Sequence, residues 1–263
     1  MNDGAGMSGL FDVTGKVAFI PGGYGEIGAA IAWGLARHGA KVAVAGRDAA
    51  KAEALATRMR AAGLVATGLA MDAHSVGSIQ SAADGVVAAF GTIDILMNCV
   101  GIQREQPMLE VTEEAWDEIC AVNLKAAMFS AQAVARHQVA AGRGGRHVHL
   151  LSVRAQLGLR DRGYSAYCST KGGLAMLVRQ HAMELARHGI TVNGIAPTVV
   201  RTAMASHWFD NPVTAKAIVD RIPLGRVAEP RDIVGAAVFF CAPAADFVTG
   251  QILYADGGIT ASQ

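Results

Sequence analysis

Short apolar runs alternate with longer stretches of helical periodicity along nearly the whole chain. The run Lys16–Ile20 stops at Pro21-Gly22-Gly23, which predicts a buried strand closed by a turn. Helical spacing of apolar residues then extends from about Glu26 to His38. The same patterns predict further strands over 41–45, 64–71, 93–98, 146–152, 190–195 and 251–254, and helices over 48–62, 75–90, 113–140, 165–188 and 230–241.

Strands that alternate with long helices predict an α/β fold. We expect one doubly wound parallel sheet of about seven strands with helices on both faces. No linker or change of composition divides the chain, so residues 13–263 are expected to form a single domain after a flexible tail, 1–12. Residues 198–222 break the periodicity and carry bulky aromatic side chains, and we expect them to form a lid over a substrate.

Composition and charge narrow the classes of partner. The 263 residues are 52% hydrophobic and 17% charged, and the formal net charge is +1. This balance gives no electrostatic reason to expect a nucleic-acid or membrane partner, and it suits a small-molecule substrate or self-association. No apolar run reaches the roughly 18 residues that span a bilayer. The first ten residues lack the apolar segment of a secretion signal, so we expect a cytoplasmic protein.

The four cysteines stand singly, and the chain has neither a CxxC pair nor a Cys/His cluster. Free thiols are therefore expected, rather than disulfides or a zinc site. His147 and His149 share one face of an expected strand, but no third ligand follows at metal spacing. We expect no bound metal.

A glycine-rich turn separates the first expected strand from the first expected helix. Ligands of an open parallel sheet lie beyond the carboxyl ends of its strands, where such a turn lets a pyrophosphate approach the backbone. We predict dinucleotide binding at this turn, through Gly22, Tyr24, Gly25, Ile27 and Gly28. The second expected strand is followed by Gly46 and Arg47, and an arginine there favours the 2′-phosphate of NADP. NADP is the preferred cofactor of this interpretation, NAD is the alternative, and Asp48 is expected to cap the next helix.

Tyr167 and Lys171 lie four residues apart at the start of an expected long helix. This spacing places them on one helical face, and a nearby ammonium is expected to lower the pKa of the phenol. Such a tyrosine can pass a proton to or from a hydroxyl or carbonyl oxygen. The pair is only a hint until other parts of the chain are considered.

Over residues 14–258 the chain resembles the short-chain dehydrogenase/reductase family, which has a Rossmann-type fold. The matching segments are Pro21, Gly22, Glu26 and Gly28 for the glycine motif, Asp72 after the third strand, Asn98-Cys99-Val100-Gly101, Pro197-Thr198 and Asp256-Gly257-Gly258. The resemblance implies a catalytic tetrad of Asn123, Ser152, Tyr167 and Lys171. It also implies a cofactor site that adds Arg47, Asp72, Ala73, Asn98, Val100, Gly101, Pro197, Val200 and Thr202 to the glycine turn and to Tyr167 and Lys171.

In such enzymes the nicotinamide carries the hydride and the protein manages the proton. By resemblance, Tyr167 is the general acid in ketone reduction, Lys171 holds the ribose hydroxyls and Ser152 binds the substrate oxygen. Asn123 is implied to hold a water that links Lys171 to solvent. Members of this family also associate through the two long helices, so a homotetramer or homodimer is expected.

The chain departs from the family pattern in the glycine turn and the catalytic loop. Pro21 replaces a threonine, and Glu26 occupies the second motif glycine, where a carboxylate near a pyrophosphate is unfavourable unless it points away. Ser152 and Tyr167 are also further apart than is common, and we assign the extra length to the loop between them.

Arginine recognises carboxylate or phosphate bidentately, so the arginines near the catalytic loop favour a sugar acid or a similar polar hydroxy or keto compound. Candidate substrate residues are Arg104, Arg154, Gln156, Arg160, His207 and Trp208. The stretch Tyr167–Leu174 also resembles gluconate 5-dehydrogenase-type members of the family. Two alternatives stay open: a 3-oxoacyl carrier-protein reductase, docking through Arg136, Arg143, Arg146 and Arg187, and a non-catalytic NADP-binding sensor or scaffold.

Overall fold

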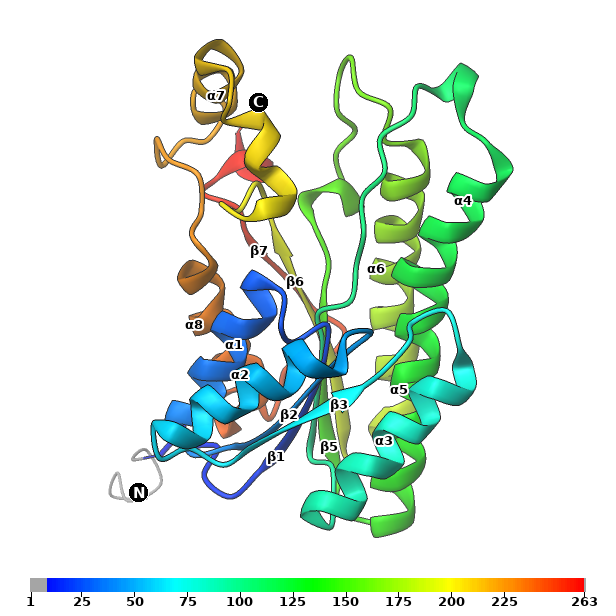
Figure 1. Cartoon of the computed structure of the whole chain (residues 1–263), viewed down its shortest axis with the longest axis vertical. Coiled ribbons are helices and arrows are strands. Elements are labelled where there is room, and N and C mark those ends of the chain that lie inside the picture. Colours follow the sequence, from blue (N-terminus) through cyan, green and yellow to red (C-terminus); the bar gives the residue numbers. More distant parts are fainter. Residues whose placement is uncertain (1–8, 263) are drawn as a thin grey trace.

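The structure, a computed structural model, describes residues 9–262, apart from the side chain of His207 (Figure 1). Seven parallel strands form one sheet in the order β3-β2-β1-β4-β5-β6-β7. The strands are β1 Val17–Pro21, β2 Lys41–Gly46, β3 Ala66–Ala70, β4 Ile95–Asn98, β5 Gly145–Leu150, β6 Ile190–Pro197 and β7 Ile252–Ala255. The expected doubly wound sheet is thus confirmed, and every strand lies within two residues of a predicted one.

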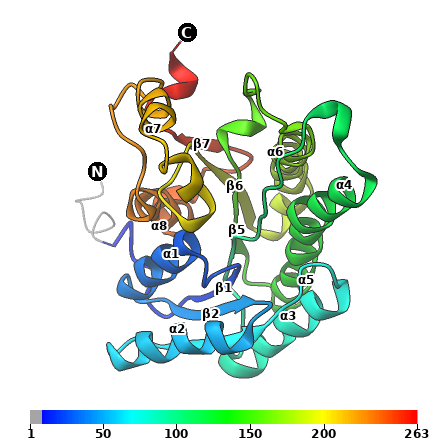
Figure 2. The same ribbon diagram turned by 45° about the horizontal axis from the view of Figure 1, so that its top comes forward.

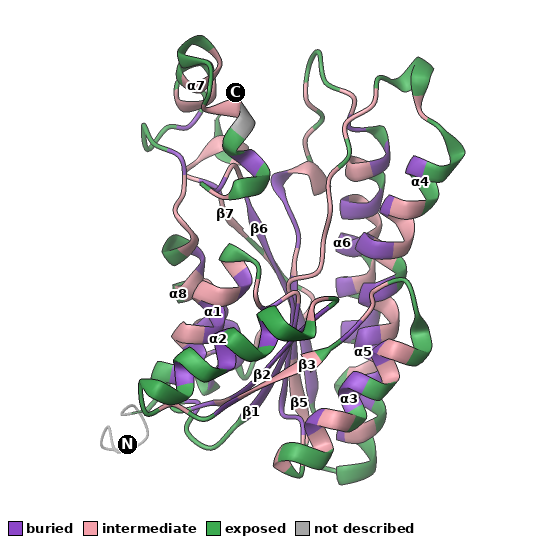
Figure 3. Ribbon diagram, in the orientation of Figure 1, coloured by how far each residue is buried: buried purple, intermediate pink, exposed green. Residues whose placement is uncertain are grey.

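Helices cover both faces of this sheet. The helices α1 Glu26–Arg37, α2 Ala49–Ala61 and α8 Val234–Cys241 pack on one face, and α3 Val76–Phe90, α5 Ala126–Ala141 and α6 Ser165–Leu185 pack on the other. Every residue of β1 and of β6 is buried, as the run of purple along the strands shows (Figure 3). Burial on both faces explains why these strands read as continuous apolar runs in the sequence.

The expected helix over 113–140 is two helices joined by one widened turn. Helix α4 Glu113–Cys120 begins at Thr112, whose side chain accepts a hydrogen bond from the Ala115 amide, as predicted for the cap. A single π-helical turn, Ala121–Lys125, then leads into α5. Asn123 lies within this turn. Such wide turns inside helices are frequent at functional sites, because the extra residue redirects a side chain.

Residues 198–222 contain regular structure that the sequence pattern did not predict. They include a short 3-10 segment, Ala203–Trp208, and the helix α7 Pro212–Val219. Asn211 caps α7 and Pro212 occupies its first turn, so the local signals for a helix start are present. Eight residues are too few to show helical periodicity beside three consecutive bulky side chains.

Because all the strands are parallel, the loops that follow their carboxyl ends lie along one edge of the sheet. Helix α7 and the loop over residues 155–164 stand on opposite sides of this edge (Figure 2). Among the described residues, no helix has the length and apolar character needed to cross a bilayer.

Candidate active site

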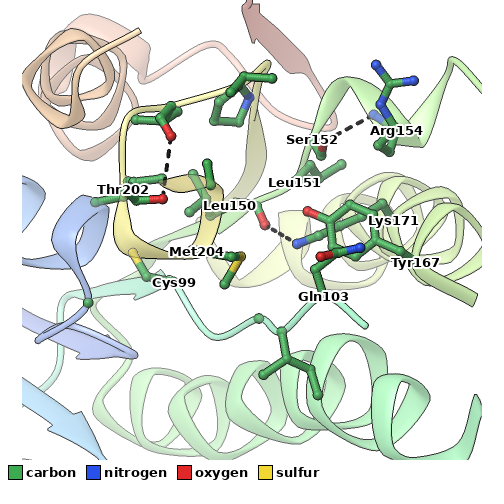
Figure 4. A pocket seen from close by; sticks show the side chains of 18 of the residues that line it. Cys99, Gln103, Leu150, Leu151, Ser152, Arg154, Tyr167, Lys171, Thr202 and Met204 are labelled. Carbon is green, nitrogen blue, oxygen red and sulfur yellow. Dashed lines mark hydrogen bonds between the residues drawn. The ribbon is translucent and has the colours of Figure 1, made fainter. Parts of the chain in front are cut away.

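One cavity of about 610 Å³ lies along this edge, and residues that follow nearly every strand line it. Its wall is built by the glycine turn after β1, the ends of β2, β4, β5 and β6, the first turns of α6, and residues 198–222. Figure 4 shows Ser152, Tyr167 and Lys171 gathered on one side of this cavity, with Cys99 and Thr202 across from them. The cavity is therefore shared by the expected nucleotide end and the expected catalytic end.

The glycine turn presents bare backbone to the cavity. Gly22 has a φ of +73°, and a Cβ there would lie 2.7 Å from the carbonyl carbon of Cys99. A Cβ on Gly28 would lie 2.5 Å from the Gly22 carbonyl oxygen. Both positions therefore require glycine. Gly22, Tyr24, Gly25, Ile27 and Gly28 all line the cavity at the N-terminus of α1, an arrangement that fits a pyrophosphate.

Glu26 does not turn its carboxylate back into the glycine turn. Its Oε2 accepts a hydrogen bond of 2.6 Å from the amide of Ala203, at the start of the 198–222 segment. This contact joins the first turn of α1 to a segment far away in the sequence. The unfavourable approach to a pyrophosphate, expected from the motif, is thus partly relieved by a partner that only the folded chain supplies.

At the end of β2, where NAD-binding proteins place a carboxylate for the adenosine ribose, this chain has Gly46. At the carboxyl end of β2 a Cβ on Gly46 would lie 2.4 Å from the Tyr24 ring, so an acidic side chain there would require the ring to move. Asp48 instead accepts a hydrogen bond of 3.0 Å from the Lys51 amide and caps α2, as predicted. Arg47 lines the cavity and is exposed. Its guanidinium is available to a phosphate.

Asp72 and Asn98 lie beside the cavity rather than on its wall. The Asp72 carboxylate accepts hydrogen bonds from the amide of His74, at 3.0 Å, and from the His74 ring, and these lower its pKa. The neighbouring Ala73 and His74 do line the cavity. His74 was not identified from the sequence, because a single exposed histidine after a strand carries no distinctive signal.

Asn98 is buried at the end of β4 and organises the loop that follows. Its Oδ1 accepts a hydrogen bond of 3.2 Å from the Val100 amide, and its Nδ2 lies 3.3 Å from Nδ1 of His149. The residues that reach the cavity are Cys99, Val100 and Gly101. Burial raises the pKa of the Cys99 thiol to about 12, so this thiol stays protonated.

Three of the four residues of the implied tetrad meet on the cavity wall. Ser152 follows β5, and Tyr167 and Lys171 lie on the first turns of α6. The Lys171 Nζ donates a hydrogen bond of 2.9 Å to the Leu150 carbonyl and lies 5.6 Å from the centre of the Tyr167 ring. The four-residue spacing therefore does bring the phenol and the ammonium together on one helical face.

The expected lowering of the Tyr167 pKa is wrong. Burial raises the pKa of Tyr167, and a hydrogen bond with Ser152 only partly opposes this effect. Burial also lowers the pKa of Lys171 to about 8. Desolvation is thus the largest cause of both pKa shifts, and neither shift has a contribution from the other member of the pair. Tyr167 is consequently protonated, the state that a general acid needs.

Asn123 lies behind the cavity wall and holds the loop after β4. It is fully buried, its Oδ1 accepts from the Ile102 amide at 2.8 Å, and its Nδ2 donates to the Ile102 carbonyl at 2.9 Å. A Cβ on Gly101 would lie 3.6 Å from both Asn123 Oδ1 and Lys171 Nζ. The π-helical turn therefore places the Asn123 amide against the loop that contains Gly101 and Ile102, and Lys171 lies close to the same loop.

The candidate substrate residues divide into two groups. Arg154, Arg160 and Trp208 line the cavity, whereas Gln156 is exposed outside it and Arg104 pairs with Glu118 at 3.1 Å. The side chain of His207 lies outside what the structure describes. Arg162, Tyr164 and Arg221 also line the cavity, although the sequence analysis gave neither Tyr164 nor Arg221 a role.

Residues 198–222 contact the catalytic helix through aromatic side chains. The Trp208 ring stacks on Tyr164 at 6.4 Å between centroids, and Tyr164 meets Tyr167 edge-on at 5.9 Å. Pro197, Val200 and Thr202, at the end of β6, complete the wall on this side. The segment thus closes one side of the cavity above the catalytic residues.

Within residues 9–262 no cluster of three or more His, Cys, Asp or Glu side chains could hold a metal ion. The cysteines Cys99, Cys120, Cys168 and Cys241 are all free thiols.

Comparison with known proteins places this architecture among oxidoreductases. A family model described as enoyl-(acyl carrier protein) reductase matches residues 24–260. The chain is 36% identical to gluconate 5-dehydrogenase of Gluconobacter oxydans, over 96% of this chain and 98% of that protein. It is 39% identical to D-threitol dehydrogenase of Mycolicibacterium smegmatis, over 95% of each. Gluconate 5-dehydrogenase of Burkholderia cenocepacia, solved with NADP and tartrate, superimposes with a TM-score of 0.93 at 35% identity, over 97% of this chain and 98% of that one.

Proposed function

Because the chain belongs to the short-chain dehydrogenase/reductase family and is an NAD(P)-dependent oxidoreductase, we propose that it uses NADP to interconvert a secondary alcohol and a ketone in a sugar acid or a related polar hydroxy compound. The observation that carries this proposal is the meeting of Ser152, Tyr167 and Lys171 in the same cavity as the bare glycine turn. Relatives that act on gluconate and on threitol support a polar substrate.

When bound, the nicotinamide supplies or accepts the hydride. In ketone reduction, the protonated Tyr167 donates its phenolic proton to the carbonyl oxygen, and the Ser152 hydroxyl donates a hydrogen bond to the same oxygen as negative charge develops there. In alcohol oxidation, Tyr167 takes the proton back. Lys171 would hold the hydroxyls of the nicotinamide ribose, with its ammonium oriented by the Leu150 carbonyl. Asn123 acts on this group indirectly, by fixing the loop that contains Gly101.

We propose NADP as the preferred cofactor on two grounds. Arg47 lines the cavity, and the Tyr24 ring fills the space that an acidic side chain at position 46 would need. The related gluconate 5-dehydrogenase of Burkholderia cenocepacia was solved with NADP, which supports the same choice here.

Replacing Arg47 with glutamine is expected to raise the KM for NADPH about tenfold or more, because a charged hydrogen bond to the 2′-phosphate is worth roughly 1.5–3 kcal/mol. The KM for NADH should change little. Steady-state kinetics with both cofactors would measure this, with Arg58→Gln as a control at an exposed arginine outside the cavity. A wild-type preference for NADH would contradict the assignment.

The charge of Glu26 is expected to weaken cofactor binding. Glu26→Gln removes the charge and keeps an amide oxygen for the Ala203 amide, so NADPH should bind roughly fivefold more tightly, which corresponds to about 1 kcal/mol of relieved repulsion. Glu26→Gly removes the charge and the hydrogen bond together and thus separates the two contributions. Fluorescence titration would give the dissociation constants, with Glu114→Gln as a control on the exposed side of α4. Equal affinity in wild type and Glu26→Gln would refute this prediction.

We further propose that residues 198–222 act as a lid and that the chain forms a homodimer or homotetramer through α5 and α6. The exposed Val139, Met176 and Met183 on these helices support the association, since burying them removes apolar surface from water. Light scattering coupled to size-exclusion chromatography would give the mass of the assembly.

The proposed activity is tested by NADPH oxidation over a panel of ketoses, keto acids and 3-oxoacyl thioesters. Turnover of keto acids or ketoses is the expected result. Turnover of thioesters alone would favour the carrier-protein reductase, although Arg143 and Arg146 already pair with Asp94 and Asp246 and leave a weaker docking face. Cofactor binding without turnover of any compound would favour the sensor.

A further inference from the structure

The substrate end of the cavity carries more cationic than anionic side chains. Arg162 pairs with Glu105 at 3.4 Å, and Glu118 pairs with Arg104. Within the described part of the chain, no carboxylate lies within ion-pair distance of Arg154 or of Arg221, and both line the cavity. These two guanidiniums therefore face the cavity without a counter-ion.

Arg154 is held in place next to the catalytic serine. Its backbone amide donates a hydrogen bond of 3.2 Å to Ser152 Oγ, which Figure 4 shows as a dashed line. Its Nη1 donates to the carbonyls of Leu157 and Gly158, at 3.2 and 2.6 Å. The side chain is half-buried, and the remaining donors of the guanidinium lack a charged partner. A guanidinium fixed by carbonyls in this way can hold an anion at a defined distance from the reacting oxygen.

Arg221 lines the same cavity as Arg154 and comes from a different part of the chain. It follows α7 at the end of the 198–222 segment, whereas Arg154 belongs to the loop after β5. Both side chains line one cavity, and burial, together with a smaller effect of the Arg221 charge, lowers the pKa of Arg154. Arg154 is half-buried and Arg221 is exposed, so water partly screens their repulsion. An anion bound by both side chains would replace this repulsion with attraction.

We propose that Arg154 and Arg221 together bind an oxyanionic group of the substrate, so that the enzyme acts on sugar acids or sugar phosphates in preference to neutral polyols and ketoses. This inference rests on the proposed function and narrows its substrate class to anionic compounds. The relatives alone do not make this choice, because they include enzymes of gluconate and of neutral threitol. The anion would also bridge the catalytic loop and the lid, so binding of the charged substrate favours closure of the 198–222 segment.

A matched set of substrates tests this inference directly. 5-Keto-D-gluconate and L-sorbose share one carbon skeleton around the reacting ketone and differ in a carboxylate against a hydroxymethyl group, and L-sorbose 6-phosphate carries a phosphate at the same end. The measured quantity is the ratio of kcat/KM for each anion to that for L-sorbose. We expect a ratio of about ten or more in wild type, since each charged hydrogen bond contributes roughly 1.5–3 kcal/mol. The two anionic substrates show which oxyanion the pair prefers.

Arg154→Gln and Arg221→Gln should each lower this ratio about tenfold or to near one. The double variant should lower it by less than the product of the single effects, because both side chains hold one group. Arg58→Gln is the control, and its ratio should equal that of wild type. A wild-type ratio near one, or a ratio that survives both substitutions, would overturn the inference.

Direct binding separates this inference from the proposed function. If no compound is turned over, calorimetric titration with D-gluconate and with D-glucitol still reports on the pair, because these compounds differ only in the anionic group. Binding of D-gluconate that is tighter than that of D-glucitol, and lost in Arg154→Gln and Arg221→Gln, supports the anion site even then. Equal binding of the two compounds would reject it.

Discussion

Replacing Tyr167 with phenylalanine is expected to lower kcat for ketone reduction about 10²–10⁴-fold, the usual contribution of a positioned acid or base. The change removes one hydroxyl from a side chain whose raised pKa keeps it protonated beside Ser152. NADPH affinity should stay within about twofold, because the hydroxyl is assigned to proton transfer and not to cofactor binding. Stopped-flow kinetics and a fluorescence titration on the same preparation would measure both quantities.

Two other tyrosines serve as controls for this experiment. Tyr254→Phe alters a phenol on β7 outside the cavity and should leave kcat unchanged. Tyr164→Phe alters the phenol that packs edge-on against Tyr167. Burial raises the pKa of Tyr164, so the effect of this change should be several-fold at most. If Tyr164→Phe abolished turnover and Tyr167→Phe did not, the acid would have been assigned to the wrong tyrosine.

Replacing Lys171 with methionine is expected to abolish most activity and yet stabilise the folded chain at neutral pH. Activity should fall about 10²-fold or more, since a charged donor in the active site is lost. The side chain is 3% exposed, and burial lowers its pKa from 10.5 to about 8, which corresponds to a cost of about 3 kcal/mol for the charged form. Part of the gain is offset by the lost hydrogen bond to Leu150.

This stabilisation should depend on pH in a defined direction. Below pH 8 the lysine is protonated in both the folded and the unfolded chain, so the full cost is present. Between pH 8 and 10.5 the unfolded chain binds more protons, so wild type gains stability relative to Lys171→Met as the pH rises. Urea unfolding at pH 7 and pH 10 would measure the change. Lys51→Met, at a side chain that is 70% exposed, should show no such trend. A difference between wild type and Lys171→Met that does not shrink at pH 10 would contradict the buried charge.

Local patterns were sufficient to predict the sheet and its helices. Strands buried on both faces appear as continuous apolar runs, and the apolar residues of the helices between them recur at helical spacing. The order of the elements could therefore be deduced without any tertiary contact. The same patterns missed α7, because eight residues beside three bulky ones carry too little periodicity. They also joined α4 and α5 into one helix, because a single π-helical turn barely disturbs the spacing of apolar residues.

The candidate site was only partly predictable for a related reason. The spacing of Tyr167 and Lys171 determines that they share a face, but the sign of the Tyr167 pKa shift depends on burial, which the whole cavity sets. Glu26 is unfavourable when the glycine motif is considered alone, and the Ala203 amide that donates a hydrogen bond to its carboxylate lies far away in the chain. Arg221 had no local signal in the sequence, since only the folded chain brings it into the same cavity as Arg154.

The sequence by itself therefore determined the order of strands and helices, the glycine turn, and the shared helical face of Tyr167 and Lys171, because each depends on spacing along a few turns of chain. The tertiary structure decided the raised pKa of Tyr167, the hydrogen-bond partner of Glu26 and the presence of Arg154 and Arg221 in one cavity. These properties depend on desolvation and on charges brought together from distant segments, and neither is encoded within any one stretch of residues.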